Sequence, residues 1–275
     1  MADFLAQMAE SSQARVAKAM SERDLDRLVR LVDSASLPPR LVLSDGFDVI
    51  AEVKGHSPAE GELADEASLD RVDLANQYAD GGAMAVSVLS EPTRFAGNLA
   101  HVATVARTLA ERQVPVMRKD FLVSPYQIYE ARLSGAGGVL LITAMLDDAQ
   151  LEAMLLTAAS LSLFVLLECF DEADIERSAA LLGHPTAIDM IDAGQLLLGV
   201  NTRNLRTLAV DTHRLANLAP RLPTGVITVA ESGLKTASDA ARVAELGYRA
   251  GLVGTALMRS DDPKGLIRAM REAAN

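Results

Sequence analysis

The sequence predicts an α/β protein built as a (β/α)8 TIM barrel with an N-terminal helical extension. Eight short apolar runs of strand length recur along the chain, helical segments lie between them, and the repeat is about 24 to 35 residues. Parallel strands covered by helices on both sides are continuously apolar, and eight such units fill a barrel of ordinary size. A doubly wound sheet is the alternative, but that fold usually has about five to seven strands.

Residues 1–45 precede the first strand, and we expect them to form the helical extension. The runs 4–20 and 22–34 have helical periodicity, and the sequence LPPR at 37–40 ends the second run. A frayed tail would expose many leucines, so we expect both helices to pack on the barrel. We assign residues 46–275 to the barrel, as one structural domain.

The predicted strands are defined by short apolar or β-branched runs. They are 48–53, 83–89, 114–117, 137–143, 163–168, 195–201, 225–231 and 250–256.

Helices are predicted where apolar residues follow a spacing of three and four. The clearest examples are 69–82, 124–138 and 236–250. Ser124-Pro125 and Thr236 are typical of helix N-termini, and Gly135 and Gly247 are typical of helix C-termini.

The charge balance argues against nucleic acid or an anionic membrane as the main partner. Acids outnumber bases by 37 to 26 in 275 residues, which gives a net charge of −11, whereas binding of phosphate backbones needs a basic surface. A small phosphorylated ligand remains compatible, because it needs only one local positive pocket.

Cys169 is the only cysteine, which excludes an intramolecular disulfide and a cysteine-based metal site. We interpret it as a small residue of the barrel wall. The four histidines have no ligand-like spacing, so we expect no metal. No signal peptide is recognisable, and no run of about 18 apolar residues predicts a membrane span. We therefore expect a cytoplasmic protein.

Several predicted strands finish on charged residues, and this pattern predicts the position of the active site. In the stretch PVMRKDF at 115–121, three consecutive charged residues follow an apolar strand and cannot be buried unpaired. Similar charges end other strands at Glu52, Lys54, Glu168 and Glu231. In a (β/α)8 barrel the carboxyl ends of the strands form the active-site face, so these side chains should converge. Structural ion pairs are the alternative explanation for one or two of them.

The residue types in this set suit proton transfer to and from a carboxylated substrate. Glu52 and Lys54 are two residues apart, so they point to the same side of their strand, and Lys119 and Glu168 complete an acid–base group. Asn201 adds a neutral amide, and Arg203 adds a fork that fits a carboxylate.

Two strand ends are typical of a phosphate site. Ser232-Gly233 and Gly254-Thr255 follow the last two predicted strands, and each pair precedes a helix. Glycine allows backbone N–H groups to approach phosphate oxygens closely, and the loops after strands seven and eight commonly bind phosphate in these barrels. The pocket as a whole therefore predicts a small phosphorylated carboxylate as substrate.

Several longer motifs resemble the indole-3-glycerol phosphate synthase family. They are IAEVKGHSPAEGEL, ADGGAMAVSVLSEPTRFAGN, PVMRKDFLVSPYQIYEARLSGAGGVLLI, GVNTRNL and VAESGL followed by LVGTALMRSDDP, which together span about residues 47 to 263. The resemblance implies a carboxy-lyase of tryptophan biosynthesis. It would close the indole ring of 1-(2-carboxyphenylamino)-1-deoxyribulose 5-phosphate with loss of CO2 and water, and without a metal or an organic cofactor.

The resemblance also implies residue roles. Lys119 matches the general acid, Glu168 the base of the dehydration, Lys54 the partner of the substrate carboxylate, and Glu52 the residue that holds both lysines. The other matched positions are Asn201, Ser232, Ser57, Arg203, Leu205 and Glu231 around the substrate, Phe95, Phe121 and Leu140 in the apolar wall, and Gly233, Gly254 and Thr255 at the phosphate.

Three departures from the family pattern leave alternatives open. Gly55-His56 and Glu60 make the entrance loop less basic, and the segment 181–195 is longer than usual. A paralogue acting on a modified anthranilate-derived substrate is one alternative. A phosphosugar isomerase of the same pathway is another, although that enzyme usually has a cysteine base after strand one. A non-catalytic barrel is a third. The chain is expected to act as a monomer or a homodimer.

Overall fold

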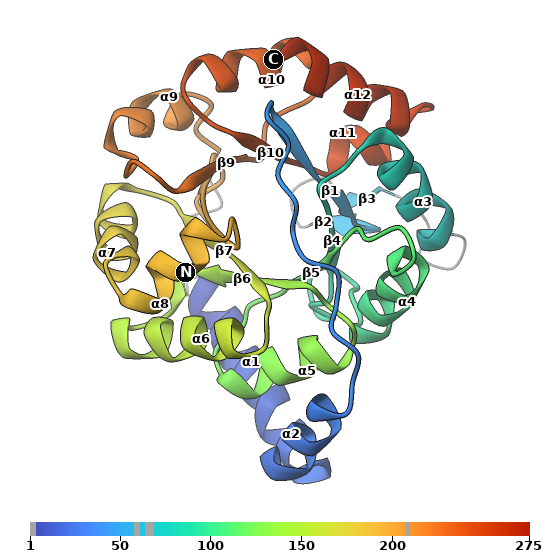
Figure 1. Cartoon of the computed structure of the whole chain (residues 1–275), viewed down its shortest axis with the longest axis vertical. Helices are drawn as coiled ribbons and strands as arrows, with labels where there is room; N and C mark the ends of the chain where they lie inside the picture. Colours follow the sequence, from blue (N-terminus) through green and yellow to red (C-terminus); the bar gives the residue numbers. More distant parts are fainter. Residues whose placement is uncertain (1–3, 58–60, 64–68, 207–209) are drawn as a thin grey trace.

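The computed structural model describes residues 4–57, 61–63, 69–206 and 210–275, and it confirms the predicted barrel. Eight parallel strands form a closed barrel, in which each strand pairs with its neighbours along the chain and the first pairs with the last (Figure 1). The strands are β1 (Asp48–Val53), β4 (Ala85–Leu89), β5 (Val116–Lys119), β6 (Gly138–Ile142), β7 (Phe164–Cys169), β8 (Leu196–Asn201), β9 (Ile227–Glu231) and β10 (Ala250–Val253).

Helices surround the barrel, and their ends follow the predicted signals (Figure 1). Ser124 accepts a hydrogen bond from the backbone N–H of Tyr126, and Thr236 forms a reciprocal cap with Asp239. Gly135 and Gly247 follow helix ends with positive φ angles of 82° and 96°. The surrounding helices are α3 (Arg71–Gly81), α4 (Leu99–Leu109), α5 (Pro125–Leu133), α6 (Asp148–Ser160), α7 (Glu172–Leu182), α8 (Pro185–Asp192), α9 (Arg214–Leu218), α10 (Ala237–Glu245), α11 (Thr255–Met258) and α12 (Pro263–Ala273).

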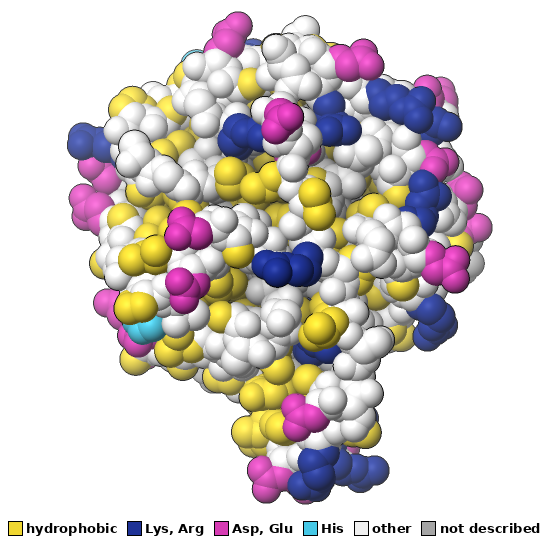
Figure 2. All heavy atoms as spheres, viewed as in Figure 1, with side chains coloured by type: hydrophobic (Ala, Val, Ile, Leu, Met, Phe, Trp, Pro, Cys, Tyr) yellow, Lys and Arg dark blue, Asp and Glu magenta, His cyan; other side chains and the backbone are white. Residues whose placement is uncertain are grey.

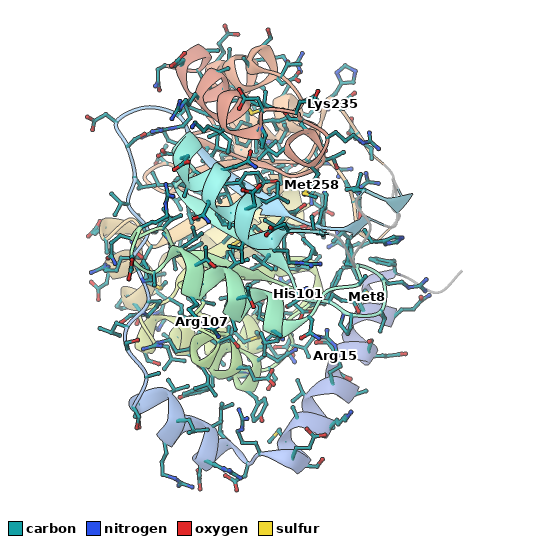
Figure 3. The ribbon with its side chains drawn as sticks, turned by 90° about the vertical axis from the view of Figure 1, so that its right-hand side faces the viewer. Met8, Arg15, His101, Arg107, Lys235 and Met258 are labelled. Carbon is teal, nitrogen blue, oxygen red and sulfur yellow. The ribbon has the colours of Figure 1, made fainter. Side chains whose placement is uncertain are left out.

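Two helices precede the barrel, as predicted: α1 (Phe4–Glu22) and α2 (Leu25–Asp33). Both bury an apolar face, and the hydroxyl of Tyr126 in α5 donates to the carbonyls of Ala19 and Arg23 at 3.1 and 2.8 Å. Residues 35–47 then cross the end of the barrel that faces the viewer in Figure 1. The first turns of α1 lie on the opposite side of the molecule, which is the right-hand side of Figure 3.

Two predicted strands were misplaced. We expected a strand at 114–117, but β5 is Val116–Lys119 and continues through two cations. The strand tolerates them because each cation has a carboxylate partner, as described below. We also expected a strand at 250–256, but β10 ends at Val253 and Thr255 begins α11.

Alternation of side chains along each strand creates two apolar layers. In β1, for example, Ile50 belongs to the cluster inside the barrel, whereas Val49 and Ala51 belong to the cluster between the strands and the helices. Cys169 lies in this outer cluster, as the sequence predicted for a wall residue. A residue two positions after an inner apolar residue lies on the same side of the strand. At the end of a strand, such a side chain therefore points into the barrel.

The segment 181–195, which we expected to be longer than in the family, contains the helix α8 between α7 and β8. His184 caps this helix by accepting a hydrogen bond from the backbone N–H of Thr186 at 3.2 Å. This helix thus lies on the outside of the barrel. None of the described helices is both long and apolar enough to span a lipid bilayer.

Candidate active site

Five polar side chains point inward at the carboxyl ends of the strands, because each continues an inner row of the barrel. Each follows, on the same side of its strand, an apolar residue of the inner cluster. That residue comes two positions earlier, or four positions earlier in β8, and the five are Ile50, Met117, Leu166, Leu197 and Val229. The five polar residues are Glu52, Lys119, Glu168, Asn201 and Glu231, as predicted from the sequence. Of the strand-end charges that the sequence marked, Glu52, Lys54, Lys119, Glu168 and Glu231 thus meet at one end of the barrel, whereas Arg118 and Asp120 do not.

Glu52 binds both lysines of the predicted site. One carboxylate oxygen lies 2.7 Å from the Nζ of Lys54, and the other lies 3.5 Å from the Nζ of Lys119. Burial by itself would raise the pKa of Glu52, but the two ammonium groups outweigh it and lower the pKa below its ordinary value. Glu52 is therefore an anion that orients the two cations.

Lys119 is protonated at neutral pH. Burial alone would lower the pKa of this lysine, but the carboxylates of Glu52, Glu168 and Glu231 outweigh burial and raise the pKa above its ordinary value. Lys119 therefore has a proton to donate.

Glu168 is fully buried and makes one hydrogen bond to its neighbour on β8. The Nδ2 of Asn201 donates to its Oε1 at 2.9 Å, and the backbone N–H of Arg203 fixes the amide by donating to Asn201 Oδ1 at 2.9 Å. Among the described residues, the Oε2 of Glu168 has no partner. Burial raises the pKa of Glu168, and Lys119 and Asn201 only partly offset this effect. A carboxylate with a raised pKa is a stronger base than an ordinary one.

Glu231 is buried beside Glu168, and neither of its oxygens has a partner among the residues that the structure describes. Burial, followed by the charge of Glu168, raises its pKa well above the ordinary value. Gly199 of β8 leaves the room for this side chain, since a Cβ atom there would lie 2.0 Å from Glu231 Oε1.

An apolar wall lies next to the charged groups. The ring centroids of Phe95 and Phe121 are 6.0 Å apart. Phe121 also packs edge-on against Phe4 of α1, with 5.9 Å between the ring centroids. Leu140 and Leu205 belong to the same inner cluster. The structure thus groups all the predicted wall positions and adds Phe4, which the sequence did not indicate.

The predicted phosphate residues lie at the ends of β9 and β10. Ser232 and Gly233 have positive φ angles of 65° and 82°, which turn the chain sharply at the end of β9. Gly254 approaches the charged group closely, because a Cβ atom there would lie 2.4 Å from Glu52 Oε1 and 2.9 Å from Lys54 Nζ. Gly254 therefore borders the pocket that holds the lysines, and Gly233 lies beside Thr202 at the end of β9.

The entrance loop after β1 forms a short hairpin, β2 (His56–Ser57) with β3 (Gly61–Glu62). The Nδ1 of His56 lies 2.9 Å from the carbonyl oxygen of Arg94, and so the hairpin is linked to the loop that carries Phe95. Ser57 lies in β2, and its side chain is outside the described part of the structure, as is the whole of Glu60.

Contrary to the prediction that the strand-end charges all converge, a buried ion network lies on the other side of β5. Arg118 and Asp120 alternate with Lys119, face away from the pocket, and bind each other at 3.1 Å. Arg15 of α1 binds Asp120 through two nitrogens, at 2.8 and 2.9 Å. Because side chains alternate along a strand, the sequence could have indicated that Arg118 and Asp120 face away from Lys119. No signal in the sequence indicates Arg15 as the partner of Asp120.

No group of three or more potential metal-binding side chains occurs in the portion of the chain that the structure covers. The polar groups of the pocket are two ammonium ions, three carboxyls and an amide. These groups can neutralise an anionic substrate, donate a proton and accept one.

Comparison with known proteins agrees with the chemistry of the pocket. The sequence model of the family described as indole-3-glycerol phosphate synthase matches residues 5–270. The synthase of a Nocardioides species is 43% identical over 252 residues, which cover 92% of this chain and 90% of that protein. The synthase of Rhodococcus opacus is 41% identical over 254 residues, with 90% and 88% covered.

Solved structures of other barrels show the fold alone. The 3-hexulose-6-phosphate synthase of Salmonella typhimurium has a TM-score of 0.61 at 13% identity, and the alignment covers 83% of this chain and 98% of that one. Thiamine phosphate pyrophosphorylase from Pyrococcus furiosus has a TM-score of 0.58 at 14% identity, with 83% and 95% covered. Since the family model spans almost the whole chain and relatives above 40% identity agree with it, this chain belongs to the indole-3-glycerol phosphate synthase family.

Proposed function

We propose that the protein closes the indole ring of 1-(2-carboxyphenylamino)-1-deoxyribulose 5-phosphate and releases CO2, water and indole-3-glycerol phosphate. Membership in the family gives the reaction. The observation that carries the assignment to this pocket is the ion group in which Glu52 holds both Lys54 and Lys119, with Glu168 nearby. The group contains the acid, the base and the cation that the reaction needs.

The order of events follows from the charges. Lys54 binds the substrate carboxylate, and the ring stacks along the wall formed by Phe95 and Phe121. Lys119 donates its proton to the substrate carbonyl as the ring carbon attacks, and loss of CO2 restores the aromatic ring. The hydroxyl group then leaves as water: a lysine ammonium group of the pocket gives a proton to its oxygen, and Glu168 takes a proton from the newly closed ring. In this proposal Arg203 and Ser232 bind polar atoms of the substrate.

The phosphate is assigned to the ends of β9 and β10. Backbone N–H groups at Gly233, Gly254 and Thr255 bind its oxygens in this proposal. A surface pocket of about 440 Å³, lined by Lys235, Thr255, Ala256 and Arg259, supports the assignment because it places two cations beside Thr255.

The proposal extends to the whole protein. It acts in the cytoplasm, as a monomer or a homodimer, on a small phosphorylated carboxylate and not on nucleic acid. Residues 1–45 form its helical extension, and residues 46–275 form its single barrel domain.

The test is to follow indole fluorescence after mixing the purified protein with the substrate. Lys119→Ala should lower kcat at least about 100-fold while the protein stays folded, since general acid catalysis contributes about 10²- to 10⁴-fold. Lys18→Ala removes an exposed lysine of α1 and should leave kcat unchanged. A Lys119→Ala variant that keeps more than a tenth of the activity would exclude Lys119 as the essential acid.

Ring-substituted substrates separate the two remaining possibilities for substrate class. The unaltered protein should have a higher kcat/KM for the plain substrate than for substituted ones. A preference for a substituted ring would instead favour the modified anthranilate-derived substrate.

A further inference from the structure

The end of β5 is held from outside the barrel by helix α1. The two side chains next to Lys119 in the sequence, Arg118 and Asp120, point away from the pocket and are buried. Asp120 therefore lies between the active site and the N-terminal extension.

Asp120 is saturated with donors from three parts of the chain. Its Oδ1 accepts from Arg15 Nη2 at 2.8 Å and from the backbone N–H of Phe121 at 2.8 Å. Its Oδ2 accepts from Arg15 Nη1 at 2.9 Å, Ser90 Oγ at 3.0 Å and Arg118 Nη2 at 3.1 Å. Burial would raise the pKa of Asp120, but the two guanidinium groups outweigh it and lower the pKa to about 2. Asp120 is therefore ionised at every pH at which the protein is assayed.

A second contact from α1 reaches the following residue. The hydroxyl of Ser12 donates to the carbonyl oxygen of Phe121, and Gln127 of α5 donates to the same hydroxyl at 2.9 Å. On the side of the neighbouring strand β4, the backbone N–H of Ser90 donates to the carbonyl of Lys119 at 3.0 Å. Helix α1 and strand β4 thus fix the backbone on both sides of the Lys119 side chain.

Arg118 cannot replace Arg15 without losing other contacts. Its Nη1 donates to the carbonyl of Gln127 at 2.9 Å and lies 3.3 Å from Glu130, and its Nε donates to Ser90 Oγ at 3.3 Å. Arg15, in contrast, gives both of its terminal nitrogens to Asp120. A planar fork of this kind fixes the direction of a carboxylate as well as its charge.

We propose that Arg15 is a positioning residue for catalysis: through its bidentate pair with Asp120 it sets the backbone at 119–121 and thereby places the ammonium group of Lys119. This inference rests on the proposed role of Lys119 as the acid. Arg15 touches neither substrate nor reacting atoms in this account. Misplacement of a catalytic group by about 1 Å costs on the order of 100-fold in rate, so the effect should fall on kcat.

The experiment compares Arg15→Ala, Arg15→Lys and Asp120→Asn in the full chain. Arg15→Ala should lower kcat by about 10- to 100-fold, with KM changed less than about 3-fold. Arg15→Lys keeps the charge but loses the fork, so its kcat should lie between that of Arg15→Ala and that of the unaltered protein. Arg15→Ala in the Asp120→Asn background should cost less than about 2-fold more, because both changes break the same pair.

Two controls separate positioning from loose docking of α1. Tyr126→Phe removes the hydrogen bonds to Ala19 and Arg23 at the far end of the helix, and it should leave kcat unchanged. If Arg15 only attached α1 to the barrel, both Arg15→Ala and Tyr126→Phe would loosen the helix. Phe4 would then lose its contact with the aromatic wall, and KM would rise in both variants. Thermal unfolding of each variant identifies the temperature range in which all of them are folded.

The outcomes distinguish this inference from the proposed function. An Arg15→Ala variant with unchanged kcat, additive effects of Arg15 and Asp120, or a KM effect shared with Tyr126→Phe would overturn the positioning role while Lys119 stays the acid. Retention of activity in Lys119→Ala would overturn both.

Discussion

At the scale of single residues, the site depends on carboxyl groups in unequal surroundings. Glu52 lies between two ammonium groups and stays ionised, whereas Glu231 is buried beside Glu168 with no donor among the described residues. The physical difference is the number of cations within reach of each carboxyl group. One pocket therefore holds both a carboxylate that orients cations and a carboxyl whose pKa is raised well above its ordinary value.

The raised pKa of Glu231 predicts a cost in stability at neutral pH. An unfolded glutamate loses its proton near the ordinary pKa of 4.5, whereas burial and the charge of Glu168 raise the pKa of folded Glu231 well above that value. The folded state therefore binds more protons above this pH, and this group lowers the free energy of unfolding as the pH rises toward its folded pKa. Glu231→Gln should be as stable as the unaltered protein near pH 4 and more stable at pH 7.

Urea unfolding between pH 4 and 8 checks this prediction. The gain should grow with pH by at most about 1.4 kcal/mol per unit. Glu245→Gln, on the exposed face of α10, is the matched control and should show a difference that does not change with pH. A stability difference for Glu231→Gln that is constant or shrinks as the pH rises would contradict burial of the neutral acid.

At the scale of elements, the loops between strands and helices are joined to each other around the pocket. The β2–β3 hairpin contacts the β4–α4 loop through His56 and Arg94, and the β8–α9 loop contacts α7 through Arg206, which lies 2.7 Å from both Asp171 and Asp174. These contacts connect segments that carry Phe95, Leu205 and Glu168. His56 therefore contributes a contact between two loops of the protein.

His56→Ala should weaken substrate binding with little change in chemistry. The substitution removes one hydrogen bond between the hairpin and the loop of Phe95, and a bond of this kind contributes about 0.5–1.5 kcal/mol. KM should therefore rise by roughly 2- to 10-fold, and kcat should stay within about 2-fold. His213→Ala, at an exposed position before α9, should change neither value. A large fall in kcat with constant KM would place His56 in the chemistry instead.

At the scale of the whole molecule, the protein is acidic on average but concentrates cations at one end of the barrel. Its net charge is −11, and Figure 2 shows acidic and basic side chains interspersed over one face. In contrast, Lys54 and Lys119 converge inside the barrel, and Lys235 and Arg259 line the pocket beside Thr255. A local group of cations attracts a small anion even when the overall charge is negative.

Inorganic phosphate should bind to the ends of β9 and β10, stabilise the fold and compete with substrate. A ligand at 100 times its Kd stabilises a protein by about 2.7 kcal/mol, which corresponds to several degrees in Tm. Sodium chloride at equal ionic strength is the control for screening. Lys119→Ala should retain the phosphate effect, because the proposed site lies on β9 and β10. Protection that chloride reproduces, or that disappears in Lys119→Ala, would contradict the assignment.

The sequence by itself determined the barrel, the inward row of charged residues and the family. Continuously apolar runs of strand length indicate a sheet that is covered on both faces. Alternation then fixes the side of the strand that each residue faces, so Glu52, Lys119, Glu168 and Glu231 could be placed together. Only the tertiary structure decided which charges pair: Glu52 with both lysines, Asn201 with Glu168, and Arg15 with Asp120, which lie 105 residues apart. Local patterns contain the direction of a side chain, but the partner of a buried charge depends on which distant segment packs against it. For that reason the role of α1 at the end of β5 became visible only in the folded chain.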